Sequence, residues 1–163
     1  MNYSFDTSTK AQSKFVIEEY FPAIVEFSPE ELNNYFIEFN YKDSDMFELS
    51  VHPKTHTLKR FSLTLCNHYE IKEASMCIPP YVNGTITITG PESTECKMFL
   101  AVVYTDGLQI LLSNAPASYF YKTGQLIFAI SEEGEVISVY LTDLAEEELS
   151  HLRNELSLQS PVC

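Results

Sequence analysis

Two pairs of apolar segments, each interrupted by a short turn, constrain the fold more than any other feature of this chain. In the first pair, residues 97–104 and 108–112 flank a turn that contains Asp106 and Gly107. Asp-Gly between two apolar runs predicts a β-hairpin, because glycine tolerates the positive φ of a tight primed turn. Residues 98–103 are apolar on both faces, which predicts a strand covered on both sides.

The second pair predicts another hairpin further along the chain. Residues 126–130 and 135–141 are both mainly apolar, and they flank the loop Ser131-Glu132-Glu133-Gly134. The long segment that links the two hairpins contains three consecutive aromatic residues at positions 119–121. The second half of the chain is therefore expected to be dominated by antiparallel strands.

Three earlier segments alternate apolar and polar side chains with a period of two. They cover residues 46–51, 61–65 and 85–89, and this pattern is typical of strands with one solvated face. Residues 76–82 contain Pro79-Pro80, and proline cannot donate to a sheet ladder, so this segment predicts a connection or an edge strand.

The first third of the chain carries two helix signals. Ser8 or Thr9 can cap a helix that runs to about Tyr20, where Pro22 ends it. A second helix is predicted from Ser28, because Pro29 suits the first helical position and Glu31 can close a capping box. Its aromatic stripe repeats at helical spacing and would pack on the sheet: Leu32, Tyr35, Phe36 and Phe39.

A third helix is predicted at the C-terminal end. Asp143 can cap it, and three successive glutamates at positions 146–148 favour the positive end of the helix dipole. The expected buried stripe consists of Ala145, Leu149, Leu152 and Leu156.

These elements predict one α+β domain over residues 1–163, with residues 1–7 and 158–163 loosely held. It consists of an antiparallel sheet of about six or seven strands, two N-terminal helices and one C-terminal helix.

Charge is the outlying feature of the composition. The formal net charge is −13, and residues 1–50 hold 10 acids and 3 bases while residues 131–163 hold 8 acids and 1 base. This balance argues against nucleic acid as a partner, since phosphates demand lysine and arginine, and it disfavours an anionic membrane surface. Solubility alone is the ordinary alternative explanation for the acidity.

The chain shows no secretory signal and no apolar run approaching the roughly 20 residues that span a bilayer. Its four cysteines, Cys66, Cys77, Cys96 and Cys163, form no CxxC pair. We therefore expect reduced thiols in a cytoplasmic protein, three of them packed and Cys163 on a loose tail.

No motif predicts a reaction, so no catalytic residue, cofactor or metal is expected. His52 and His56 have ligand spacing, but Pro53 and the strand pattern make them two solvated loop histidines. A zinc site from Cys66, His68 and Cys77 is the weaker alternative. An enzyme whose active site assembles from distant residues also remains open.

Two features instead predict protein binding. In the aromatic run at 119–121, at least one ring must face away from the core, and tyrosine is enriched at interface hot spots. Acidic residues also gather at strand ends, where binding groups are usually presented. The candidate binding residues are Asp43, Asp45, Glu48, Tyr119, Tyr121, Glu132, Glu133 and Glu135. For the tyrosines, a covered edge strand is the alternative.

In size, acidity and layout the chain resembles the immunity proteins of bacterial toxin systems, in particular those of contact-dependent growth inhibition. The resemblance implies a cytoplasmic protein, not an enzyme, that binds a cognate toxin domain, often a basic nuclease, and blocks its active site. It carries over no functional residue and predicts no oligomeric state. One alternative is a small-ligand-binding module or accessory enzyme with a pocket between sheet and helices. Another is an inhibitor that mimics nucleic acid.

Overall fold

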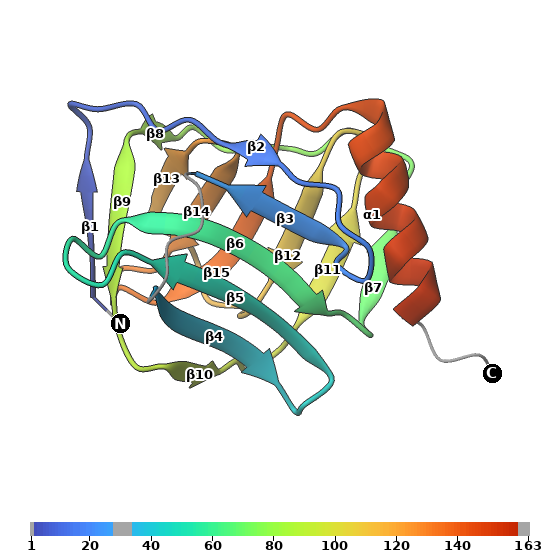
Figure 1. Cartoon of the computed structure of the whole chain (residues 1–163), viewed down its shortest axis with the longest axis horizontal. Helices are drawn as coiled ribbons and strands as arrows, with labels where there is room; N and C mark the ends of the chain where they lie inside the picture. Colours follow the sequence, from blue (N-terminus) through green and yellow to red (C-terminus); the bar gives the residue numbers. More distant parts are fainter. Residues whose placement is uncertain (1, 28–33, 160–163) are drawn as a thin grey trace.

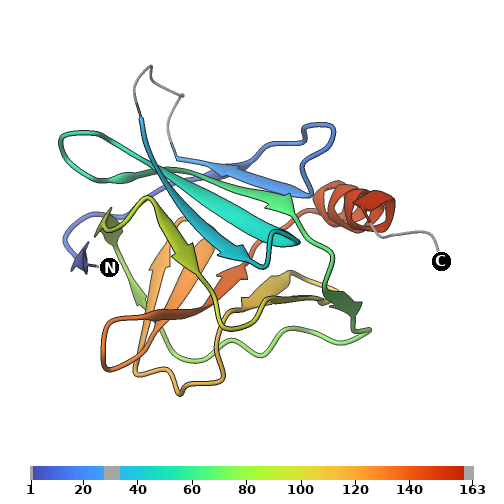
Figure 2. The same ribbon diagram turned by 90° about the horizontal axis from the view of Figure 1, so that it is seen from below.

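Two β-sheets stacked face to face make up most of the molecule (Figure 2). The computed structural model describes residues 2–27 and 34–159. A two-stranded pair lies at one end of the stack, and a single described helix lies at the other end (Figure 1). No helix within the described ranges is long and apolar enough to cross a membrane.

The first sheet has six strands in the order β10-β4-β5-β6-β3-β2. Its strands pair antiparallel except at one edge, where β10 runs parallel to β4. The strand bounds are β2 (Lys14–Phe15), β3 (Ala23–Glu26), β4 (Tyr35–Tyr41), β5 (Asp45–Val51), β6 (Leu58–Leu65) and β10 (Ser93–Glu95).

The second sheet has seven strands in the order β7-β11-β12-β15-β14-β13-β8. Its centre consists of the two hairpins predicted from the sequence, β11/β12 and β14/β15, while the short strands β7 and β8 add to the edges in parallel. The bounds are β7 (Tyr69–Ile71), β8 (Val82–Asn83), β11 (Leu100–Val103), β12 (Leu108–Leu111), β13 (Tyr119–Thr123), β14 (Leu126–Ile130) and β15 (Val136–Leu141).

The N-terminal residues form a strand instead of the expected loose segment. Strand β1 (Asn2–Asp6) pairs antiparallel with β9 (Thr85–Thr89). The ring of Phe5 lies 4.4 Å from that of Tyr121, which anchors this strand to the seven-stranded sheet. Hydrogen bonding on one side and ring contact on the other therefore hold it in place.

The main core lies between the two sheets. Phe47 is fully buried there, and its ring stacks on Phe39 at 4.7 Å and contacts Phe61 at 5.3 Å. The segment before β8 runs across the outer face of the seven-stranded sheet (Figure 2). Met76 of this segment forms a second apolar cluster with side chains of β14 and β15. Strand β14 is consequently buried on both faces, as the apolar run at 126–130 indicates.

The two predicted N-terminal helices are wrong. Residues 8–20 contain turns and the short strand β2, and Tyr35–Tyr41 forms strand β4. In residues 35–41 the apolar side chains fit a period of two as well as a helical period, since Ile37 and Phe39 are buried while Phe36 between them is exposed. Pairing with β5 decides between the two periods. The predicted cap at 28–31 lies outside the described residues, and the fold is a mainly β structure, not α+β.

Turn chemistry also differs from the sequence prediction. Gly107 does not adopt a positive φ; a Cβ there would lie 2.5 Å from the carbonyl oxygen of Leu141 and 2.7 Å from Cε of Met76. Glycine is thus needed at position 107 because the backbone there lies close to Leu141 and Met76. The primed turn instead joins β4 to β5, where Lys42 and Asp43 have φ values of 46° and 59°.

The C-terminal helix α1 (Glu146–Gln159) is confirmed, but its cap differs from the prediction. The backbone N–H of Ala145 donates to Glu148 Oε1 at 2.8 Å. Ala145 therefore occupies the N-cap position, and the Glu148 side chain accepts the hydrogen bond from its N–H, as in a capping box. Asp143 has a φ of 57° and binds Lys122 instead. Leu152 and Leu156 are buried as expected, whereas Ala145 is exposed.

Candidate functional site

Asp45, a predicted binding residue, is fully buried. Its Oδ1 accepts backbone N–H groups of Asn67 and His68 at 2.7 and 3.0 Å. Its Oδ2 lies 2.7 Å from Ser44 Oγ and 2.6 Å from His68 Nδ1. This carboxylate therefore ties the start of β5 to the segment after β6, and no partner can reach it in this structure.

The other two residues of that predicted cluster do not form one surface patch with it. Asp43 is exposed at the tip of the β4/β5 turn. Glu48 is half-buried on the outer face of the six-stranded sheet, directly opposite Glu38 in the β4/β5 register. The strand register, and not closeness in sequence, decides which acids are neighbours.

The second predicted acidic cluster is displayed on a well-held hairpin loop. Glu132, Glu133 and Glu135 are exposed at the β14/β15 turn. Ser131 organises this loop, because its backbone bonds Gly134 at 3.0 Å and Glu135 at 2.9 Å, and its Oγ accepts the N–H of Glu135 at 3.1 Å. The three carboxylates therefore project from a loop that is fixed in shape.

The fold adds three further acids to this surface. Glu95 on β10 and Glu135 line the same cleft, of about 280 Å³, which Lys97 also lines. Glu38 and Glu92 line a neighbouring hollow beside the same edge strand. We call this surface the acidic edge, and it consists of Glu38, Glu92, Glu95, Glu132, Glu133 and Glu135.

Sequence reasoning missed the acids of β4 and β10. Glu38 falls in a segment with a helical pattern, and Glu92 and Glu95 follow a Gly-Pro turn that shows no strand signal. They meet only because β10 pairs in parallel with β4, placing Ser93 opposite Glu38. Such a non-local pairing has no signal in a single sequence.

One predicted tyrosine lies beside the acidic edge. Tyr119 is 44% exposed and pairs with Ile130, the residue immediately before the acidic hairpin loop. Tyr121 is half-buried, because Phe5 and Tyr3 pack against it at ring distances of 4.4 and 5.8 Å. Tyr119 is thus accessible to a partner, whereas Tyr121 mainly supports the N-terminal strand.

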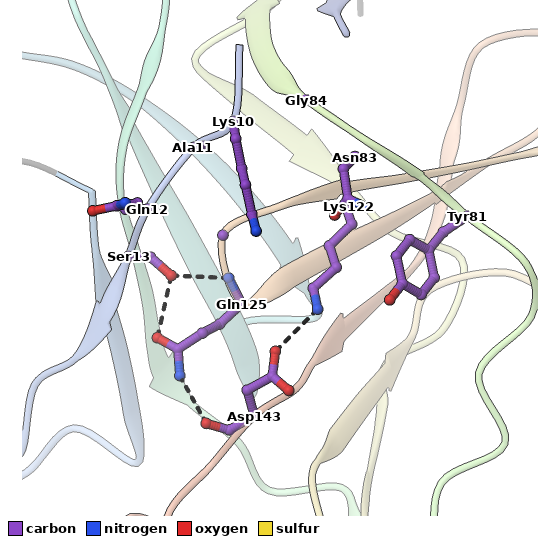
Figure 3. A pocket seen from close by; sticks show the side chains of 11 residues that line it. Lys10, Ala11, Gln12, Ser13, Tyr81, Asn83, Gly84, Lys122, Gln125 and Asp143 are labelled. Atoms are coloured by element: carbon purple, nitrogen blue, oxygen red, sulfur yellow. Dashed lines mark hydrogen bonds and ion pairs between the residues drawn. The ribbon is translucent and has the colours of Figure 1, made fainter.

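A polar pocket lies on a different part of the surface (Figure 3). Its volume is about 470 Å³, and it lies where the segment at 10–13 crosses the β13/β14 turn. Ser13 Oγ accepts the backbone N–H of Gln125 at 2.8 Å and donates to its Oε1 at 3.2 Å. The N-terminal helices expected to line a ligand pocket are absent from the described ranges, so loops and strand ends form this one.

Lys122 is the most constrained charged group of that pocket. Its side chain is 16% exposed, and its Nζ lies 3.0 Å from Asp143 Oδ2 and 5.3 Å from the centre of the Tyr81 ring. The hydrogen bond from Lys122 holds the pKa of the Asp143 carboxyl below its ordinary value, against an opposing effect of burial. The ammonium group is therefore held in one position.

Histidines and cysteines form no comparable centre in the described part of the chain. No group of three His, Cys, Asp or Glu side chains there is placed to hold a metal ion. Burial raises the pKa of the Cys66 thiol to about 12 and that of Cys96 to about 11, so both are poor nucleophiles. Cys77 is exposed, contrary to the expected packing, and Cys163 lies outside the described residues.

Neither the known protein-family models nor the curated proteins contain a match to this chain. The acidic edge and the polar pocket are therefore the features from which a function can be inferred.

Proposed function

We propose that this chain is a cytoplasmic immunity-type protein that binds a basic toxin domain and neutralises it by stoichiometric blockade. The observation that carries the proposal is the acidic edge, where carboxylates from β4, β10 and the β14/β15 loop lie around adjoining clefts. These acids come from distant parts of the chain, so their proximity is a property of the folded surface.

Charge complementarity is the physical basis of the proposal. A nuclease must hold phosphates with cationic residues, and a carboxylate surface can occupy such a site. Opposite charges also steer diffusional encounter, which raises association rates at low ionic strength. A protein that must capture a toxin before it reaches its substrate benefits from rapid association.

Exposed aromatic side chains supply the apolar contacts that charge alone does not provide. Phe36 is 43% exposed and lines the hollow with Glu38 and Glu92. Tyr119 is similarly exposed beside the acidic hairpin loop. Buried aromatic anchors surrounded by polar groups are the usual composition of interface hot spots. Both ends of the acidic edge therefore carry a candidate anchor.

The rigid presentation of the carboxylates also favours binding. The loop that carries Glu132 and Glu133 is held by backbone hydrogen bonds to Ser131, so little conformational entropy is lost when a partner docks. The acids repel one another in the free protein, and a cationic partner relieves that repulsion.

The proposal is tested by capture followed by inhibition. The tagged protein is exposed to a lysate of its own host, the retained protein is identified, and the activity of its isolated toxin domain is titrated. We expect a sharp end-point at a fixed molar ratio.

A matched pair of variants assigns the binding surface: E92Q/E95Q/E135Q removes three acids of the acidic edge, and E70Q/E146Q/E147Q removes three exposed acids elsewhere.

The acidic-edge variant is expected to lose inhibition while the matched variant retains it. Equal inhibition by both variants would remove the acidic edge as the binding surface. Inhibition that grows with time at a tenth of the end-point amount would show turnover, and would favour the accessory enzyme.

A further inference from the structure

The polar pocket concentrates positive charge in an otherwise acidic molecule. Lys10 and Lys122 both extend into it, whereas Asp143 is the one carboxylate of its described lining (Figure 3). The chain as a whole has a net charge of −13. The pocket shares no lining residue with the two clefts of the acidic edge, so its chemistry is independent of the proposed toxin binding.

We propose that this pocket binds a small organic anion, whose phosphate or carboxylate group lies between the ammonium groups of Lys10 and Lys122. Lysine is a common point-charge ligand for phosphate and presents three N–H donors. The volume of about 470 Å³ lies in the range of small-molecule pockets, and it is too small for a folded partner.

The two lysines have complementary roles. Asp143 and the Tyr81 ring hold the Lys122 ammonium group, so it is positioned before a ligand arrives. Lys10 forms no ion pair with any described residue, and its exposed side chain can close over a bound anion. With two ammonium groups and one carboxylate, the lining retains a positive charge that only an anion neutralises.

At the base of the pocket, the segment at 10–13 packs closely against the β13/β14 turn. Gly124 has a φ of 57°, and a Cβ there would lie 2.5 Å from Ser13 Oγ. The absence of a side chain lets the segment at 10–13 rest on the β13/β14 turn, which brings Lys10 over the same space as Lys122. Asp143 also adopts a left-handed backbone, which is uncommon for a residue other than glycine.

Polar groups around the lysines suit a ligand with a polar body. The side-chain amide of Asn83 borders the pocket beside Lys122 (Figure 3). Tyr81 is 41% exposed and provides an apolar wall. A phosphorylated sugar or a short polycarboxylate would satisfy the cations and the Asn83 amide together.

The test measures binding of inorganic phosphate, glucose 6-phosphate and citrate to the intact chain by NMR titration. We expect saturable shifts confined to the amides of the pocket lining. The substitutions K10Q and K122Q should each weaken binding by about tenfold or more, the effect of losing one charge-assisted hydrogen bond. The matched control is K97Q, because Lys97 lines the cleft of the acidic edge instead.

Tighter binding of the phosphates assigns a phosphorylated ligand, and tighter binding of citrate assigns a carboxylate ligand. The absence of saturable shifts with all three probes would overturn the proposal, as would equal weakening by K97Q and K10Q. Lys10 is exposed, so K10Q remains informative even if K122Q perturbs folding. Toxin inhibition by K10Q should equal that of the wild type, which separates this test from that of the proposed function.

Discussion

The buried carboxylate of Asp45 lies 2.6 Å from Nδ1 of His68. Because a carboxylate accepts hydrogen bonds, this contact requires a proton on Nδ1 of His68. The same carboxylate accepts two backbone N–H groups and the Ser44 hydroxyl. It is thus a structural acid inside a chain whose other acids are mostly on the surface.

The substitution D45A should destabilise the fold strongly, because it removes the buried acceptor that the Asn67 and His68 N–H groups and the Ser44 hydroxyl share. We expect a loss of about 3 kcal/mol or more in the free energy of unfolding, measured by urea denaturation. D43N, at the exposed neighbouring turn, is the matched control and should change stability little. Equal effects of the two substitutions would contradict the structural role of Asp45.

Removing the charges of the acidic hairpin should leave the fold intact. We expect E132Q/E133Q/E135Q to have an unchanged or slightly raised melting temperature, since three neighbouring like charges are removed. With the captured toxin domain, its association rate should fall and depend less on salt. Stopped-flow association at several ionic strengths checks this, with E146Q/E147Q as the control. Wild-type rates in both variants would contradict a role of the hairpin carboxylates in toxin association.

Gly107 and Gly134 should differ in how well they tolerate a side chain, and one substitution at each position tests this difference. G107A should destabilise by about 1–3 kcal/mol, because its Cβ would collide with the Leu141 carbonyl and Met76. G134N should be mild, because asparagine tolerates the left-handed backbone and a Cβ there meets only the Tyr3 ring at 3.9 Å. Thermal unfolding of both variants measures the difference, and a harmless G107A would contradict the close approach.

Asp143 should contribute to the pH dependence of stability. Lys122 lowers its pKa in the folded state, so its contribution is present above the unfolded pKa, about 3.9, and is lost as pH falls through the folded value. Urea unfolding between neutral pH and pH 2 should therefore show a smaller acid-induced loss for D143N than for the wild type. Equal acid-induced losses of unfolding free energy in D143N and the wild type would contradict a stabilising Lys122–Asp143 ion pair.

The described thiols should differ in reactivity. In a C163S background at pH 8, iodoacetamide should modify exposed Cys77 first, while Cys66, with a pKa of about 12, should react only on unfolding. Mass spectrometry of timed samples gives the order.

Mild reductant should leave the melting temperature unchanged, and a marked drop would contradict the expectation of reduced thiols.

The sequence by itself determined the two hairpins at 97–112 and 126–141 and the C-terminal helix, because turn residues, apolar periodicity and an acidic first helical turn act over a few positions. Within the candidate site it also indicated Tyr119 and the acidic loop at 132–135. These features form from neighbours along the chain, so their signals are local.

Only the tertiary structure decided that residues 35–41 form a strand, that Asp45 is buried, and that β10 lies beside β4. The aromatic pattern at 35–39 fits a helix and a strand equally, and pairing with β5 stabilises the strand. The acidic edge and the pocket between Lys10 and Lys122 likewise join segments far apart in sequence. Such contacts depend on strand register and sheet stacking, which burial of the shared core sets for the chain as a whole.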